Sequence, residues 1–183
     1  MDLPDSIRQF KESENFWVSL ARDGISILAI VATFALLSQA VFGLWTPMVA
    51  VESGSMEPHM NVGDIIFIQN IDRTEVISHG SADDYSSFGM EGDVILYRPY
   101  GQEGVTPIIH RAMYFVEEGE PMWEDGPAAP HAGYITKGDN ENTNRYYDQQ
   151  GMVSYLTPVK EEWIIGVARY RIPYIGHVRL IFS

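Results

Sequence analysis

Residues 24–45 read GISILAIVATFALLSQAVFGLW, and no charged side chain occurs from Gly24 to Val51. About 20 helical residues, at roughly 1.5 Å each, span the hydrocarbon core of a bilayer. The stretch therefore predicts a transmembrane helix, and its uncharged length makes a buried core helix the weaker alternative. Positions 38–40 (Ser-Gln-Ala) have the small residues of a leader cleavage site, but the long apolar run and the extended acidic N-terminal region favour an uncleaved anchor.

The basic residues near this stretch set its expected orientation. Arg8, Lys11 and Arg22 precede it, whereas the flank that follows has no basic residue before Arg73. Because cytoplasmic flanks carry the excess of Lys and Arg, the N-terminus is predicted to be cytoplasmic and the bulk of the chain extracytoplasmic. The expected parts are a cytoplasmic segment 1–23, an anchor 24–45 and an extracytoplasmic domain 46–183.

The composition limits the possible functions. The 183 residues contain 25 Asp and Glu against 12 Lys and Arg, which gives a net charge of −13. Nucleic-acid binding needs a clustered basic face, so this class of partner is not expected. A strongly acidic chain with nine Arg to three Lys predicts a halophile, in whose high-salt habitat counterions screen self-repulsion. The absence of cysteine excludes disulfides, thiol nucleophiles and thiolate zinc sites.

After the anchor, the sequence predicts a β-rich domain. Short apolar runs bounded by turn residues recur, without a long amphipathic helix or a repeat. Polar stretches at 78–91, 117–132 and 140–150 are expected to be loops. The predicted fold class is thus mainly β with one N-terminal transmembrane α-helix. The expected strands lie in MVAV (48–51), DIIFI (64–68), DVILY (93–97), PIIHRAMYFV (107–116), GYIT (133–136), EWIIGVARYRI (162–172) and HVRLIF (177–182).

Ser55, in the segment 53–58 (SGSMEP), is a candidate nucleophile. A serine between a glycine and a proline turn can present its hydroxyl on a tight bend, although an ordinary serine turn is the structural alternative. A serine nucleophile needs a base within hydrogen-bond reach. No lysine occurs between Lys11 and Lys137, so the base is either Lys137 or one of the five histidines.

His110 is the best placed of these histidines. It lies inside an alternating strand, beside Arg111, where its position is rigid. A lone histidine in a strand is more often a structural residue than a catalyst, so this assignment needs a partner serine. His59 is close to Ser55 in the chain but is a strained partner for it. The remaining histidines lie in loops or near the C-terminus: His79, His131 and His177.

A histidine base works best when a carboxylate orients it, and the first candidates are the aspartates of the three Gly-Asp pairs. Asp64 and Asp93 each begin an apolar run and are interpreted as turns before strands. Asp139 ends a strand and opens a polar loop, and Asp148 lies further along the same loop. A calcium loop that begins at Asp139 fails, because Asn and Gln occupy its glycine and final carboxylate positions. No metal or cofactor motif is found, and none is expected.

These motifs, in this order, resemble the type I signal peptidases of the archaeal and endoplasmic-reticulum type. The resemblance covers most of the chain, and the Ser-Gly-Ser-Met-Glu-Pro and Lys-Gly-Asp-Asn boxes together are highly specific. The bacterial branch has a lysine where this chain has His110, so the resemblance is to the His-dependent branch, in a halophilic archaeon. The matching segments are the N-terminal anchor, SGSMEPHMNVGDIIF, GDVILYRPY, IIHRAMYF, ITKGDNENTN and GVARYRIPYIG.

The resemblance implies a role for each candidate residue. Ser55 would be the nucleophile and His110 the general base, while the Ser53 hydroxyl and the Ser55 amide would form the oxyanion hole. Asp139 matches the aspartate of the Gly-Asp-Asn box. Many relatives carry a second aspartate where this chain has an arginine, and Asp148 replaces it if the loop is longer here. The orienting carboxylate is therefore open between Asp139 and Asp148.

The resemblance also implies the reaction and its partners. The expected activity is that of a membrane-anchored serine endopeptidase that cleaves signal peptides from exported preproteins after small residues at −1 and −3. The expected partners are preprotein signal peptides, the lipid membrane and the protein translocation machinery, without a cofactor. The alternative is a catalytically silent, membrane-tethered β-module in a preprotein-processing complex.

Overall fold

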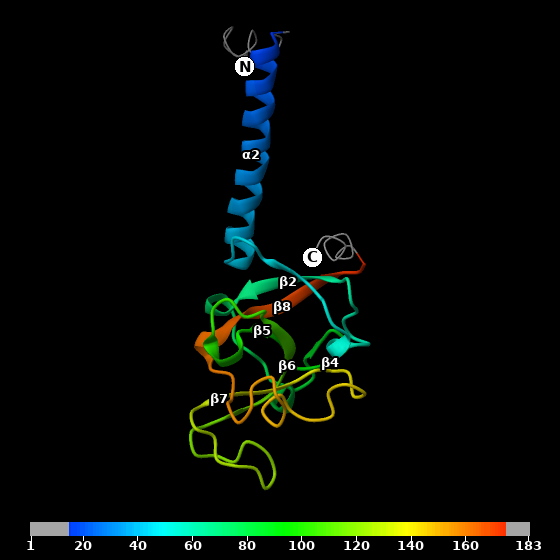
Figure 1. The fold of residues 1–183 in the computed structure, drawn as a ribbon, viewed down its shortest axis with the longest axis vertical. Coiled ribbons are helices and arrows are strands. Elements are labelled where there is room, and N and C mark those ends of the chain that lie inside the picture. The colour runs from blue at the N-terminus through cyan, green and yellow to red at the C-terminus, as the bar shows by residue number, and fades with distance from the viewer. Residues whose placement is uncertain (1–14, 175–183) are drawn as a thin grey trace.

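The computed structural model describes residues 15–174 as one long helix that stands on a β-rich domain (Figure 1). The predicted fold class, mainly β with one N-terminal apolar helix, is confirmed. The first part of the expected N-terminal segment and the expected strand 177–182 lie outside the described residues.

Helix α2, Phe16–Phe42, is almost entirely exposed. Its 27 residues extend roughly 40 Å at about 1.5 Å per residue, and Ser38 is its one buried side chain. A core helix of a soluble domain would be buried on one face, so that alternative is wrong. Within residues 15–174, α2 is the one helix that is long and apolar enough, by length and composition, to cross a membrane. It begins ahead of position 24 because the Asn15 side chain caps it by accepting a hydrogen bond from the Trp17 amide.

The strands of the domain form one antiparallel sheet and a small hairpin. The sheet has six strands in the order β1-β2-β8-β5-β6-β7, and β3 pairs with β4 in the hairpin. Each sheet strand falls within, or extends slightly beyond, a predicted apolar run. The strands are β1 (Met48–Ala50), β2 (Ile65–Asn70), β3 (Ser86–Ser87), β4 (Met90–Glu91), β5 (Val94–Tyr97), β6 (Ile108–Val116), β7 (Gly133–Lys137) and β8 (Ile164–Ile172).

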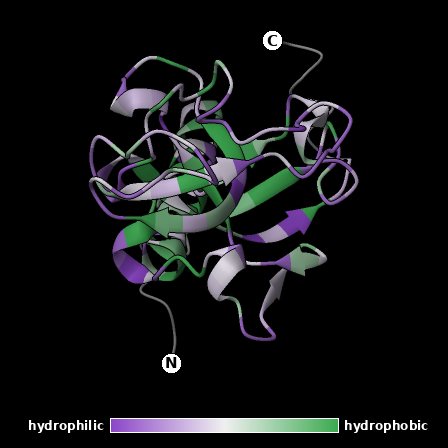
Figure 2. Ribbon diagram, turned by 90° about the horizontal axis from the view of Figure 1, so that it is seen from below, coloured by the Kyte–Doolittle hydropathy of each residue, from purple (hydrophilic) through white to green (hydrophobic). Residues whose placement is uncertain are grey.

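Strand β5 lies in the middle of the sheet and is covered on both faces. Val94 and Leu96 belong to one buried cluster, together with residues of β2, while Ile95 and Tyr97 belong to another. All four side chains are buried, which explains a run without polar alternation. Seen from below, the apolar strands lie inside the domain and hydrophilic segments surround them (Figure 2).

Some local structure was not expected from the sequence. The stretch 78–91, expected as a loop, contains a 3₁₀ turn and the β3–β4 hairpin. Asp93 is more than a turn residue, because it is fully buried and its carboxylate accepts bonds from Arg169, Tyr85 and the Ile77 amide. The 3₁₀ turns are η1 (Gly54–Met56), η2 (Ile71–Arg73), η3 (His79–Ser81), η4 (Pro99–Gly101) and η5 (Glu161–Trp163).

Candidate active site

Ser55 lies on the tight turn η1 that follows β1. The segment after β7 binds this turn through Asn140. The Asn140 main-chain amide donates to the Ser55 carbonyl at 2.9 Å, and the side-chain Nδ2 donates to the Gly54 carbonyl at 2.7 Å. Gly138 permits this approach, because a Cβ there would lie 2.6 Å from the Ser55 carbonyl oxygen. The backbone around the serine is thus fixed by residues that lie far from it in the sequence.

His110 reaches the serine from strand β6. Its Nε2 lies 3.0 Å from Ser55 Oγ, and its ring is buried with 4% of the residue exposed. The strand is held in register by β5, where Ile95 is its partner. The structure therefore brings together the serine and the histidine that the sequence singled out, within the distance that proton transfer requires.

The carboxylate beside His110 belongs to Asp148. Asp148 Oδ2 lies 2.7 Å from His110 Nδ1 and also accepts hydrogen bonds from Thr136 Oγ1 at 2.7 Å and the Tyr97 hydroxyl at 3.0 Å. Burial and the neighbouring Asp148 charge raise the pKa of Tyr97, so its phenol stays a proton donor. These contacts fix the position of the Asp148 carboxylate beside the His110 ring. When Nδ1 donates to Asp148, Nε2 is free to accept the Ser55 proton.

Asp139 points elsewhere. Its two carboxylate oxygens accept bonds from Arg111 Nε at 2.8 Å and Nη2 at 2.6 Å, and Oδ2 also lies 2.8 Å from His59 Nδ1. Arg111 is fully buried, and its Nη1 donates to main-chain carbonyls of the hairpin region. Asp139 therefore ties strand β6 to the turn that carries Asn140, and the carboxylate that lies next to His110 is that of Asp148.

The other candidate bases have partners or surroundings other than the Ser55 hydroxyl. His79 Nδ1 contacts the Glu91 carbonyl at 3.2 Å, and the His131 ring packs on Trp163. Lys137 lines a cavity with His59 and Asp139, separate from the one lined by Ser55 and His110. His177 lies outside the described residues.

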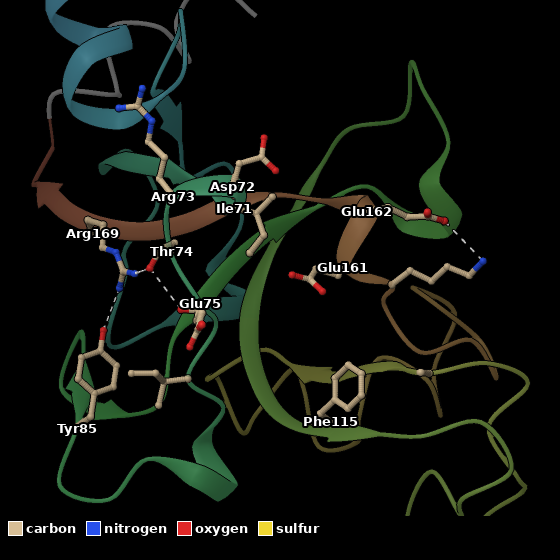
Figure 3. A pocket seen from close by; sticks show the side chains of 13 residues that line it. Ile71, Asp72, Arg73, Thr74, Glu75, Tyr85, Phe115, Glu161, Glu162 and Arg169 are labelled. Atoms are coloured by element: carbon tan, nitrogen blue, oxygen red, sulfur yellow. Dashed lines mark hydrogen bonds and ion pairs between the residues drawn. The ribbon is translucent and has the colours of Figure 1, made fainter.

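Two hollows of the surface differ in what they contain. A cleft of about 420 Å³ holds Ser55 and His110 and has a mostly apolar lining that includes Ala50, Val51 and Ile108. A larger groove of about 1270 Å³ lies around Thr74 and Arg169 and contains neither of the two (Figure 3). Within residues 15–174, no group of three or more His, Cys, Asp or Glu side chains is arranged to hold a metal ion.

Ser53 is the remaining sequence candidate. Its hydroxyl oxygen lies 3.3 Å from Ser55 Oγ, so it is adjacent to the serine that it was expected to assist. Sequence reasoning missed Tyr97, Thr136 and Asn140 as parts of the site. The signal for Thr136 was a polar residue within a buried strand, and the signal for Asn140 was its place in the Lys-Gly-Asp-Asn box. Tyr97 had no local signal.

A serine, a histidine and an aspartate joined in this line define the Ser-His-Asp class of hydrolase geometry, here on a β-rich domain carried by an apolar helix. Comparison with known proteins identifies relatives of this chain. The chain is 31% identical to the signal peptidase complex catalytic subunit sec11 of Aspergillus terreus, over 85% of this chain and 81% of that protein. The proteins of the same name from Talaromyces marneffei and Aspergillus oryzae are each 30% identical over the same shares. The chain belongs to this family of signal peptidase catalytic subunits. No protein-family model matches it.

Proposed function

We propose that this protein is a membrane-anchored serine endopeptidase that removes signal peptides from exported preproteins. The observation that carries the proposal is the hydrogen-bonded line from Ser55 Oγ through His110 to Asp148, with distances of 3.0 and 2.7 Å. Membership of the signal peptidase family supports the substrate, since the relatives are named as catalytic subunits of the signal peptidase complex.

The mechanism has two steps. Ser55 Oγ attacks the scissile carbonyl carbon while His110 Nε2 takes the hydroxyl proton, and the C–N bond breaks as His110 returns that proton to the leaving amine. Water then attacks the ester, with His110 again as base, and releases the signal peptide and Ser55. In both steps Asp148 stabilises the imidazolium and holds its orientation.

The oxyanion that forms during each attack needs hydrogen-bond donors. We assign this role to the Ser55 amide and the Ser53 hydroxyl, which lies 3.3 Å from Ser55 Oγ. One such donor is worth on the order of 3 kcal/mol in the transition state. The short side chains expected at −1 and −3 suit a cleft whose walls come from aliphatic residues such as Ala50 and Ile108.

The anchor places enzyme and substrate in the same membrane, which raises their effective concentration. We propose that segment 1–23 is cytoplasmic, that 24–45 spans the bilayer and that 46–183 is extracytoplasmic. The orientation follows from the excess of basic residues on the N-terminal side. The C-terminal end of α2 has a basic side chain against it, that of Arg73, which is distant in the sequence. The N-terminal flank still carries three basic residues, Arg8, Lys11 and Arg22. The relatives are named as subunits of a signal peptidase complex, which supports a complex with further subunits. Contact with the protein translocation machinery is part of the same proposal.

The experiment is cleavage of a radiolabelled preprotein in membranes that carry the wild type, Ser55→Ala or His110→Ala. The proposal predicts mature product with the wild type and its loss, by about 10³-fold or more, in both variants. A silent β-module would give no product with any of them. A Lys137 base would give the opposite pattern, with activity kept in His110→Ala and lost in Lys137→Met.

A further inference from the structure

The end of helix α2 is fastened to the β domain by side chains of that domain. A helix leaves its last carbonyl groups without partners along its own backbone. Arg73 Nη1 donates to the Ala40 carbonyl at 2.6 Å, and Asn70 Nδ2 donates to the Gly43 carbonyl at 3.2 Å. In Figure 3, Arg73 points out of the groove toward the helix. Its charge also offsets the negative end of the helix dipole.

The contact at this joint is close. Gly43 ends the helix with a φ of +72°, and a Cβ there would lie 2.7 Å from Arg73 Nε and 3.1 Å from Asn70 Cβ. The Phe42 and Phe67 rings pack with their centroids 5.5 Å apart. The end of the helix is therefore tightly packed against the domain in one position.

The strand that contacts the helix end is also hydrogen-bonded to the strand that precedes Ser55. Asn70 is the last residue of β2, and β2 pairs with β1, which runs directly into the Ser55 turn. The pairing extends on both sides of β1, because the Ile68 amide donates to the Pro47 carbonyl at 2.7 Å and the Val51 amide donates to the Asp64 carbonyl at 2.9 Å. A continuous hydrogen-bonded ribbon thus connects the joint to Ser55.

From this arrangement we infer that Arg73 and Asn70 are specificity-determining residues of the proposed signal peptidase. They hold Ser55 at one height and angle relative to the membrane-embedded helix. A substrate held in the same bilayer by its own apolar segment then presents to Ser55 the bond at one distance from that segment. One extended residue covers about 3.3 Å and turns the side chains to the opposite face, so a small tilt of the domain would offer the wrong bond. The inference rests on the proposed function only for its consequence in cleavage.

The cleavage experiment uses preproteins lengthened residue by residue between the apolar segment and the scissile bond, together with a short soluble peptide that carries the same cleavage site. The measured quantity is kcat/KM at the best spacing divided by kcat/KM at longer spacings. Arg73→Met should lower this ratio by roughly tenfold, because one charge-assisted hydrogen bond is lost. Its rate on the soluble peptide should be unchanged. Lys160→Met is the matched control, because Lys160 lines the same groove but pairs with Glu162. An unchanged spacing ratio in Arg73→Met, or an equal loss on both substrates, overturns the inference.

A second experiment needs no catalysis. The chain has no cysteine, so spin labels can be attached at Leu37→Cys on the helix and Met152→Cys on the domain, both of which are exposed. In lipid nanodiscs, the distance distribution should be narrow for the otherwise native chain and broader with Arg73→Met and Asn70→Ala together. An equally narrow distribution in both proteins refutes the joint, whatever the chain cleaves. If the distribution broadens but the chain cleaves no preprotein, the proposed function is refuted, whereas the role of Arg73 and Asn70 in holding the helix end is supported.

Discussion

Replacement of Asp148 by Asn should abolish most of the activity while the protein stays folded. The buried carboxylate lies 2.7 Å from His110 Nδ1, and its charge stabilises the imidazolium that forms when Ser55 attacks. Two unit charges about 4 Å apart attract by about 4 kcal/mol at an effective dielectric constant of about 20. Since about 1.4 kcal/mol is a factor of ten in rate, kcat/KM should fall by about 10³-fold. A wrong histidine tautomer would increase the loss toward about 10⁴-fold.

Asp139→Asn is the matched control, because it removes the same charge from the same loop. It breaks the ion pair with the fully buried Arg111, and an uncompensated buried charge costs about 3 to 5 kcal/mol of stability. The expected result is a lowered melting temperature with kcat/KM retained at temperatures where the variant is folded. Asp148→Asn should show the opposite pattern, with a melting temperature near that of the wild type.

The assay is cleavage of a preprotein by purified variants in lipid nanodiscs, with thermal unfolding followed by circular dichroism. Asp148→Asn with kcat/KM within about tenfold of the wild type would refute the role given to Asp148. So would a folded Asp139→Asn protein that is inactive beside an active Asp148→Asn protein.

Three further outcomes are expected. Burial raises the pKa of Tyr97 above that of an unfolded tyrosine, so with rising pH the tyrosine of the unfolded chain loses its proton first. The free energy of unfolding should therefore fall above about pH 10, by at most about 1.4 kcal/mol per pH unit. Denaturant titrations should show a smaller fall for Tyr97→Phe. Gly166→Ala places a Cβ 2.1 Å from the Gln69 carbonyl oxygen and should lower the melting temperature by about 4 to 8 °C, whereas Gly151→Ala, with 3.8 Å to its nearest neighbour, should not. Lys137→Met should keep the wild-type kcat/KM, because Lys137 lines a cavity other than the one that Ser55 and His110 line. A loss as large as that of His110→Ala would contradict this placement.

The strands and the helix could be predicted because burial leaves a direct mark on the sequence. The run VILY is apolar at every position because its strand is covered on both faces, and the uncharged stretch in α2 predicts a long apolar helix, which the structure leaves exposed. Ser55 could be singled out because it lies between a glycine and a proline turn. His110 could be singled out because it lies inside a strand and no lysine occurs between Lys11 and Lys137. The small hairpin β3–β4 could not, since its strands have only two residues each and bury little apolar surface.

The orienting carboxylate could not be predicted, because Asp139 and Asp148 both lie in the polar loop after β7. Partners from distant parts of the chain distinguish the two carboxylates. Arg111, one residue beyond His110 on the strand, donates hydrogen bonds to Asp139, while Thr136 and Tyr97 donate hydrogen bonds to Asp148. The joint at Arg73 was equally hidden, since the arginine that binds the helix end is 33 residues away from Ala40 in the chain.

In the proposed function, Ser55 cleaves a peptide bond of a membrane-inserted preprotein. The most direct measurement is the mass of the products formed by purified wild type and purified Ser55→Ala, each in lipid nanodiscs with one preprotein and no host membranes. We expect a mature product whose new N-terminus follows a small residue, with a rate at least about 10³-fold lower for Ser55→Ala. The same product at the same rate from Ser55→Ala would contradict the proposed function.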